Sequence, residues 1–262
     1  MSAKVDWHPV RMLAQRISER GEPLELTDEV RALLQRSARE VAISSKDAED
    51  ALRSPPTAMA LLQEIQRRIS EGSRRLNQAR RRAYQLRDAG DLDGARKLME
   101  GVLVAEVVPF YRAQAEIQLR ELARLAAVAM SGQVDPELPE WTQLPLLLRR
   151  IHQGKTLELS NELRAFLQRT ALTVAISEAE TEFALASMDN VAALLEKMQA
   201  RIRDGEHRIT QALYRMTSLR DAGDLEGARQ QMRDVLAVEV VPQYRQMAEE
   251  NLAGLDEVLQ EP

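Results

Sequence analysis

Residues 86–96 read LRDAGDLDGAR, and residues 219–229 read LRDAGDLEGAR, so the same eleven-residue stretch occurs twice with one conservative exchange. A glycine near the middle of such a stretch is typical of a helix end, and the aspartate that follows it can cap the next helix. The stretch therefore predicts a tight turn between two helices, with Gly90 ending the first helix and Asp91 beginning the second. Because this turn is present twice, the hairpin that it joins is also expected twice.

The similarity between the two halves extends beyond this turn. Residues 21–44 align with residues 154–177 at 15 of 24 identical positions, and residues 86–112 align with residues 219–245 at 19 of 27. Identity of this extent indicates an internal duplication. Two copies this long resemble tandem domains more than the short repeats of a solenoid.

A proline-containing segment separates the two copies. Residues 131–140, SGQVDPELPE, hold two prolines, one glycine and three acidic residues, a composition typical of a linker. We therefore predict a first unit over residues 1–130, a linker over 131–140 and a second unit over 141–262. The two units either fold separately or share one core.

A long central helix is predicted in each unit, over about residues 57–89 of the first, because apolar residues and one glycine recur at alternating steps of four and three. This period of 3.5 residues, sustained over four heptads, indicates a helix that packs along one edge against other helices. We call this edge the seam. Its members are Ala58, Leu62, Ile65, Ile69, Gly72, Leu76, Ala79, Ala83 and Leu86 in the first unit, and Val191, Leu195, Met198, Ile202, Gly205, Ile209, Ala212, Met216 and Leu219 in the second.

A glycine occupies the middle of each seam, Gly72 in the first unit and Gly205 in the second. Glycine costs about 1 kcal/mol relative to alanine inside a helix, so its presence calls for a compensating reason. Close approach of a neighbouring backbone or bulky side chain is the favoured explanation. A local bend of the helix is the alternative.

Shorter helices are expected around the long one. A helix over residues 9–20 ends at Gly21, and a second begins after Thr27, whose counterpart is Ser160. Further segments are expected at 46–52 and 179–186, and a helix after Asp91 with an apolar face is expected to fold back on the long helix. Proline breaks the chain at Pro109 and Pro242 before a final helix. The predicted fold class is thus all-α: two tandem homologous helical bundles, each with one long central helix and a tetratricopeptide-like helical hairpin.

Composition restricts the classes of function. The 262-residue chain has no cysteine, which excludes disulfides and cysteine-based nucleophiles or metal ligands and fits a cytoplasmic location. No signal peptide and no membrane-spanning stretch is expected. With 36 basic and 41 acidic residues the formal net charge is −5, so nucleic acid is a disfavoured partner.

No motif of a known enzyme class is present. The three histidines have no metal-site spacing, and neither a glycine-rich phosphate loop nor a serine-nucleophile motif occurs. We therefore predict a protein that is not an enzyme, with no catalytic residue, cofactor or metal ligand.

Glu106 and Glu239 are the possible exceptions, because each stands beside apolar residues and a proline break, where burial can turn a carboxyl group into an acid or base. The favoured interpretation is an ion pair of each glutamate, with Arg112 or Arg87 in the first unit and Arg245 or Arg220 in the second. Tyr111 and Tyr244 are expected to be core aromatics with a hydrogen-bonded hydroxyl group.

Arginines form the sharpest candidate site. The first long helix carries them in pairs one heptad apart, and the second keeps one column of them. As a binding site they would contact phosphates or a protein partner; as a structural feature they would face water or pair with acids of neighbouring helices such as Glu25, Asp28, Glu29 and Glu40. The candidate partner-binding residues are Arg67, Arg68, Arg74, Arg75, Arg81, Arg82, Arg201, Arg208 and Arg215.

Three runs of sequence carry a resemblance to a known family. GEPLELTDEVRALL at 21–34, LRDAGDLDGAR at 86–96 and LAVEVVPQYR at 236–245 resemble runs of the DUSAM family of myxobacterial proteins. The resemblance covers both copies and implies two DUSAM units, but no activity, because the function of that family is unassigned.

The leading functional hypothesis is a cytoplasmic, non-enzymatic helical module that binds another protein. Nucleic-acid binding through the arginines of the first long helix is the first alternative, and an enzyme using Glu106 and Glu239 is the second. Self-association is a further possibility, since seams of this kind also pair between chains.

Overall fold

A computed structural model describes residues 5–257 of the chain, and every regular element in this range is an α-helix. No strand occurs among these residues, which confirms the predicted all-α class. The contacts divide the chain into two compact units, Met1–Ala123 and Arg124–Pro262. None of the described helices is apolar over a length that would cross a membrane.

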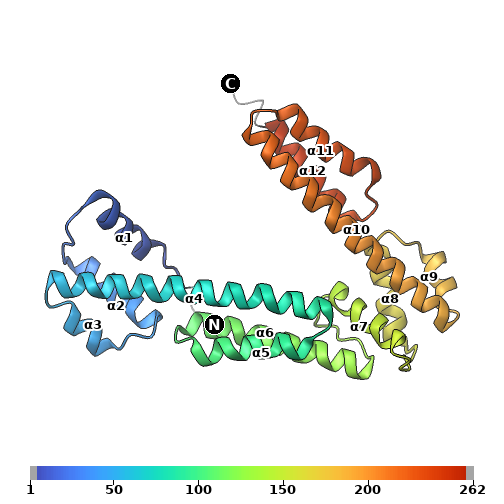
Figure 1. The fold of residues 1–262 in the computed structure, drawn as a ribbon, viewed down its shortest axis with the longest axis horizontal. Coiled ribbons are helices and arrows are strands. Elements are labelled where there is room, and N and C mark those ends of the chain that lie inside the picture. The colour runs from blue at the N-terminus through green and yellow to red at the C-terminus, as the bar shows by residue number, and fades with distance from the viewer. Residues whose placement is uncertain (1–4, 258–262) are drawn as a thin grey trace. The chain divides into compact units, whose positions relative to one another are not determined.

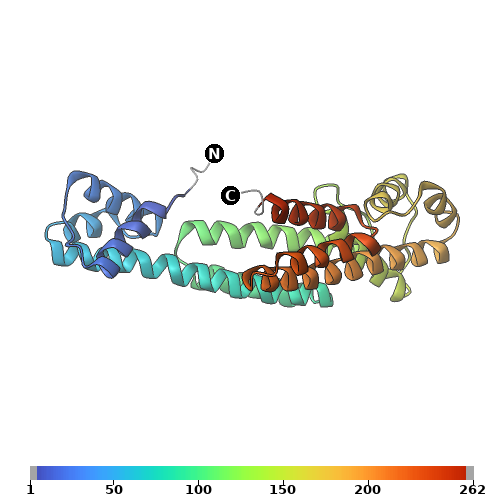
Figure 2. The ribbon, with the colours of Figure 1, turned by 90° about the horizontal axis from the view of Figure 1, so that it is seen from above.

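The first unit is built on one helix of 35 residues, α4. Helices α1, α2 and α3 pack against its first half and α5 packs antiparallel to its second half (Figures 1 and 2). The helices that begin in this unit are α1 (His8–Arg20), α2 (Asp28–Glu40), α3 (Ser45–Ala51), α4 (Pro55–Ala89), α5 (Leu92–Ala105) and α6 (Pro109–Ser131).

The second unit repeats this order around α10, a helix of 34 residues. Its helices are α7 (Glu140–His152), α8 (Asn161–Thr173), α9 (Glu178–Ala184), α10 (Met188–Asp221), α11 (Leu225–Val238) and α12 (Pro242–Glu257). The predicted helices therefore lie within a few residues of the observed ones. The spacing of Tyr244, Ala248, Leu252, Leu255 and Leu259 predicts one apolar face on the last helix, but Leu259 lies outside the described residues.

The seam of each long helix is directed into the core, as the 3.5-residue period predicts. In α4 the seam is buried from Ala58 to Ala83 except for Ala79, which is half-buried, as is Leu86 at the end. Along the first half the seam packs with Leu34 of α2, and along the second half it packs with Met99 of α5. Burial of this aliphatic edge is the main favourable contribution to the stability of the bundle.

The repeated eleven-residue stretch forms the expected turn. Gly90 ends α4 in the left-handed region with a φ of 85°, and the amides of Gly90 and Asp91 bond back to carbonyls of the last turn. The Asp91 carboxylate then accepts a 2.7 Å hydrogen bond from the amide of Gly94. A Cβ at Gly94 would lie 2.2 Å from that carboxylate, so the second glycine of the stretch is also required. In the second unit Asp224 and Gly227 repeat this contact.

The seam glycine is explained by close approach of a side chain, the explanation that we favoured. An ideal Cβ at Gly72 would lie 2.4 Å from the Tyr111 ring, and one at Gly205 would lie 2.4 Å from the Tyr244 ring. Each tyrosine follows the proline that begins the next helix, α6 at Pro109 or α12 at Pro242. The glycine thus admits the aromatic ring that anchors the start of the last helix.

The segment between α6 and α7 is held by Gln143, which is fully buried. Its side-chain oxygen accepts a 2.8 Å bond from the amide of Asp135, and its nitrogen donates to the carbonyls of Asp135 and Leu138. This stretch, which we predicted to be a linker, therefore has a defined backbone conformation.

We expect Gly72→Ala and Gly205→Ala each to lower the free energy of unfolding by about 1–2 kcal/mol, because crowding of the tyrosine ring outweighs the gain in helix propensity. Chemical denaturation followed by circular dichroism measures the change.

Two other helical glycines provide matched controls. No atom lies within 4 Å of a Cβ built at Gly101 of α5 or Gly254 of α12. Alanine at these positions should raise the free energy of unfolding by up to about 1 kcal/mol. Equal changes in the free energy of unfolding at all four glycines would show that the tyrosine contact does not require a glycine at position 72.

Candidate functional site

A buried ion pair lies where α5 meets α6. The side chain of Glu106 is 1% exposed, and one of its oxygens accepts a 2.5 Å bond from Arg75 of α4. The other oxygen accepts bonds from the backbone amides of Val107 and Val108, at 3.0 and 2.8 Å. Both carboxylate oxygens are therefore engaged, and the backbone amides of the two residues that precede α6 are satisfied.

The second unit repeats the arrangement. Arg208 of α10 pairs with Glu239, whose other oxygen accepts from the amides of Val240 and Val241 at 2.9 and 2.8 Å. The prediction of an ion pair was therefore correct for both glutamates, but the predicted partners were wrong. Arg112 and Arg245 instead donate to backbone carbonyls, including those of Glu106 and Glu239.

Arg68 and its counterpart Arg201 connect the long helix of each unit by hydrogen bonds to the residues that follow α2 or α8. Arg68 donates to the carbonyls of Val41 and Ala42 at 3.0 and 2.9 Å, and Arg201 makes the same two bonds in the second unit. These carbonyls follow the last turn of α2, where cations are favoured by the helix dipole. These arginines are therefore structural.

Arg67 is held by acids of its own helix. It bonds to Glu64 and to Glu71, all at 2.8 Å. Hydrogen bonds from Arg67, and then from Arg68, lower the pKa of Glu64 from 4.5 to about 2. The acids that pair with the candidate arginines of the first unit are thus Glu64, Glu71 and Glu106, not the predicted acids of α2 and its preceding loop.

The remaining candidates have no such partner. Arg74, Arg81 and Arg82 are exposed and make no ion pair or hydrogen bond with another described residue. The same holds for Arg215, the counterpart of Arg82 in the second unit. The counterparts of Arg74 and Arg81 are His207 and Tyr214. The candidate arginines therefore fall into two sets: those held by an acid or a backbone carbonyl, and those without a partner among the described residues.

An exposed apolar corner adjoins the ion pair. We call residues 104–110 the first corner and residues 237–243 the second. Val107 is 54% exposed and Val240 48%, although Val108 and Val241 beside them are fully buried. The other exposed large apolar residues of the corners are Val104, Phe110 and Val238.

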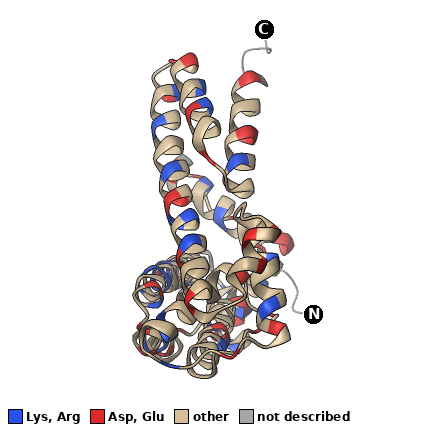
Figure 3. Ribbon diagram, turned by 90° about the vertical axis from the view of Figure 1, so that its right-hand side faces the viewer, with Lys and Arg blue, Asp and Glu red and all other residues tan. Residues whose placement is uncertain are grey.

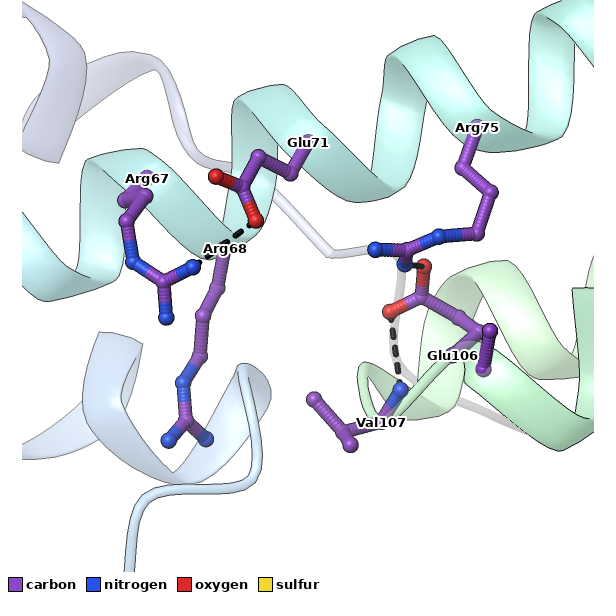
Figure 4. Close-up of a pocket in the computed structure, with 7 residues that line it drawn as sticks. Arg67, Arg68, Glu71, Arg75, Glu106 and Val107 are labelled. Carbon is purple, nitrogen blue, oxygen red and sulfur yellow. Dashed lines mark hydrogen bonds and ion pairs between the residues drawn. The ribbon is translucent and has the colours of Figure 1, made fainter.

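A surface hollow of about 250 Å³ lies beside the first corner (Figure 4). It is lined by three arginines, two glutamates and two apolar residues: Arg67, Arg68, Glu71, Arg75, Ala105, Glu106 and Val107. The hollow therefore combines fixed guanidinium groups with an aliphatic rim. Such a surface suits a carboxylate next to an aliphatic side chain.

The hydroxyl groups of the two buried tyrosines stay protonated at neutral pH. Burial raises the pKa of the Tyr111 hydroxyl group and raises that of Tyr244 to about 12. Tyr111 donates a 2.9 Å hydrogen bond to the carbonyl of Ile69, as expected of a core tyrosine. Among the described residues no group of histidine and acidic side chains is arranged to hold a metal ion.

The exposed valines were not recognised from the sequence. In the run EVVP one valine is buried and the other exposed, and no periodicity distinguishes them in so short a segment. The partners of the ion pair left no signal in the sequence either. Arg75 and Glu106 are 31 residues apart, as are Arg208 and Glu239, but the two copies align without a gap in this region, so every retained pair of residues keeps its separation.

Comparison with protein families gives one match. The model of a family described as protein of unknown function (DUF2379) matches residues 5–122 and again residues 139–255. Because these regions cover most of the chain, the chain belongs to this family as two tandem copies. No curated protein and no solved structure matches the chain.

We expect Arg75→Met and Glu106→Gln each to lower the free energy of unfolding by about 2 kcal/mol. The loss is smaller than the ~3–5 kcal/mol typical of a fully buried pair, because Arg75 is 35% exposed and regains water. Denaturation of both single variants and the double variant should give a coupling energy of about 1 kcal/mol.

Arg82→Met is the control, since Arg82 lies one heptad from Arg75 and has no partner among the described residues. Its effect should stay within about 0.5 kcal/mol. Strictly additive losses in the double variant would contradict a direct Arg75–Glu106 interaction.

We expect the pKa of Glu64 to rise from about 2 towards 4.5 in Arg67→Gln, and to rise less in Arg68→Gln, because Arg67 has the larger effect. The folded pKa lies below the ordinary value, so the pair stabilises the helix above pH 4.5 and is lost as the pH falls towards 2. Titration of the carboxyl carbon by NMR measures the shift; an unchanged value in Arg67→Gln would contradict the pairing.

Proposed function

We propose that this chain is a non-enzymatic helical protein that binds another protein through its two corners. The observation that supports this most directly is the repetition of an exposed valine, Val107 or Val240, beside a glutamate-bound arginine in both units. Exposed aliphatic residues beside fixed charges are typical of protein contact sites.

The partner that suits the corner is a protein segment with an aliphatic side chain next to a carboxylate. The aliphatic group would cover Val107 and Ala105, while the carboxylate would approach the guanidinium of Arg75, which is 35% exposed and donates only one bond to Glu106. In the second unit Arg208 is 36% exposed beside Val240. Two linked sites of this kind would raise the overall affinity for a partner with two such segments.

The alternative of an enzyme has less support. Each candidate carboxylate already accepts bonds from one arginine and from two backbone amides, so both of its oxygens are occupied. Neither has a free oxygen or a neighbouring nucleophile. We assign Glu106 and Glu239 a structural function.

Two further assignments belong to this proposal. The two copies are DUSAM units, because the runs at 21–34, 86–96 and 236–245 that carry this resemblance all fall within the matched regions. The site of action is the cytoplasm, since a chain without cysteine needs no oxidising compartment.

The test compares proteins retained from a lysate by the wild type and by the double variant Val107→Asp/Val240→Asp. Each aspartate should repel an acidic segment, and the apolar contact of the valine is lost. A direct partner should therefore be retained at least about tenfold less, which is equivalent to ~1.4 kcal/mol of binding free energy.

Leu172→Asp supplies the control, because Leu172 is 50% exposed on α8 and undergoes the same chemical change away from both corners. A partner kept by the wild type and the control but lost by the double variant supports the proposal. If all three proteins retain the same set, the corners are not the binding surface. Circular dichroism checks that each variant keeps its helices.

A further inference from the structure

Residues 72–123 comprise the second half of α4, all of α5 and most of α6, and residues 205–256 are their counterpart in the second unit. We call these two segments the hairpins of the two units, and their formal charges are opposite. Residues 72–123 contain ten Lys and Arg and seven Asp and Glu, whereas the aligned residues 205–256 contain six and nine. The hairpin of the first unit is therefore formally +3 and that of the second is −3. Figure 3 shows both signs interspersed along the helices, so the difference arises from particular positions.

The basic excess of the first unit is accessible. Arg74, Arg81 and Arg82 have no partner among the described residues, and Arg74 and Arg81 are one helical heptad apart on the exposed side of α4. Lys97 of α5 and Arg120 of α6 are also exposed and make no ion pair with a described acidic residue. The second unit has uncharged residues in place of four of these five: His207, Tyr214, Gln230 and Ala253.

The acidic excess of the second unit is equally accessible. Glu206, Asp234 and Glu250 are exposed and make no ion pair with a described residue. Their counterparts in the first unit are uncharged: Ser73, Gly101 and Ile117. Two positions change in the other direction, Glu100 to Arg233 and Glu121 to Gly254, but they do not cancel the difference.

We propose that the chain associates with a second copy of itself, the basic α4–α5–α6 hairpin of one copy contacting the acidic α10–α11–α12 hairpin of the other. Opposite charges on equivalent surfaces of one chain give complementarity between copies without any other component. Exposed Tyr214 provides a ring on which a guanidinium such as that of Arg81 can stack.

This contact differs from the seam pairing that the sequence first suggested. The seams of α4 and α10 are buried within their own units, so they are not available to another chain. A polyanion such as nucleic acid fits the basic hairpin less well, because it would approach a chain of net charge −5 that carries an acidic hairpin as well. The proposal does not depend on the corners, because the unpaired charged residues that carry it lie outside residues 104–110 and 237–243.

Sedimentation velocity of the full chain tests the proposal. At 50 mM salt and rising protein concentration the mean mass should exceed that of the 29.6 kDa monomer, and at 500 mM salt the association should weaken about tenfold or more, because exposed charges are screened. A wild type that stays monomeric at low salt, whether or not it binds an oligonucleotide, would overturn the proposal.

A pair of charge-reversed variants makes the test specific. Arg74→Glu/Arg81→Glu/Arg82→Glu makes both hairpins acidic, and Glu206→Lys/Asp234→Lys/Glu250→Lys makes both basic. Each variant alone should remain monomeric, because its hairpins repel. The equimolar mixture should associate again, because every hairpin of one variant then complements those of the other.

Arg39→Glu/Lys46→Glu/Arg53→Glu is the matched control. It produces the same change of net charge on exposed residues of the first unit that lie outside its hairpin. The control should self-associate like the wild type. Loss of association in the control to the same degree as in the hairpin variant, or failure of the mixture to associate, would contradict the proposed contact.

Discussion

Each unit depends on one close contact, a tyrosine ring lying against a glycine of the long helix. Tyr111 occupies the space that a side chain at position 72 would fill, and its hydroxyl group bonds to the carbonyl of Ile69 on the same helix. The ring contact and this hydrogen bond together fix where α6 starts relative to α4. Because Glu106 is only a few residues away, the same contact also brings its carboxylate to Arg75.

The ion pair in turn decides what the corner exposes. Glu106 accepts the amides of Val107 and Val108, so it sets the path of the backbone through this short break between helices. That path directs Val108 into the core and leaves Val107 at the surface. A buried polar group with a mainly structural function thus positions an exposed apolar one, which is the residue that we assign to partner binding.

Duplication followed by divergence explains how two similar units differ in what they offer a partner. The glycine, tyrosine, glutamate and arginine of the central contact occur in both copies, and so do the turn residues Asp91 and Gly94 or Asp224 and Gly227. The exposed positions of the hairpins changed instead, from arginine at 74 and 81 to His207 and Tyr214. Surface substitutions of this kind alter stability little, so the charge of a unit is free to change while its core is retained.

The sequence by itself determined the helices, their caps and the seam, because these follow from local periodicity and turn chemistry: Gly90 and Asp91 specify the hairpin, and the 3.5-residue period specifies the buried edge of α4. It also indicated that something approaches Gly72, but not that Tyr111 is the neighbour. Only the tertiary structure decided which arginines are free. Arg75 and Arg82 are equivalent in the sequence pattern, yet Arg75 meets a buried carboxylate 31 residues away and Arg82 meets none among the described residues. The availability of a charge depends on the partners that folding brings within reach, and local spacing along one helix carries no information about them.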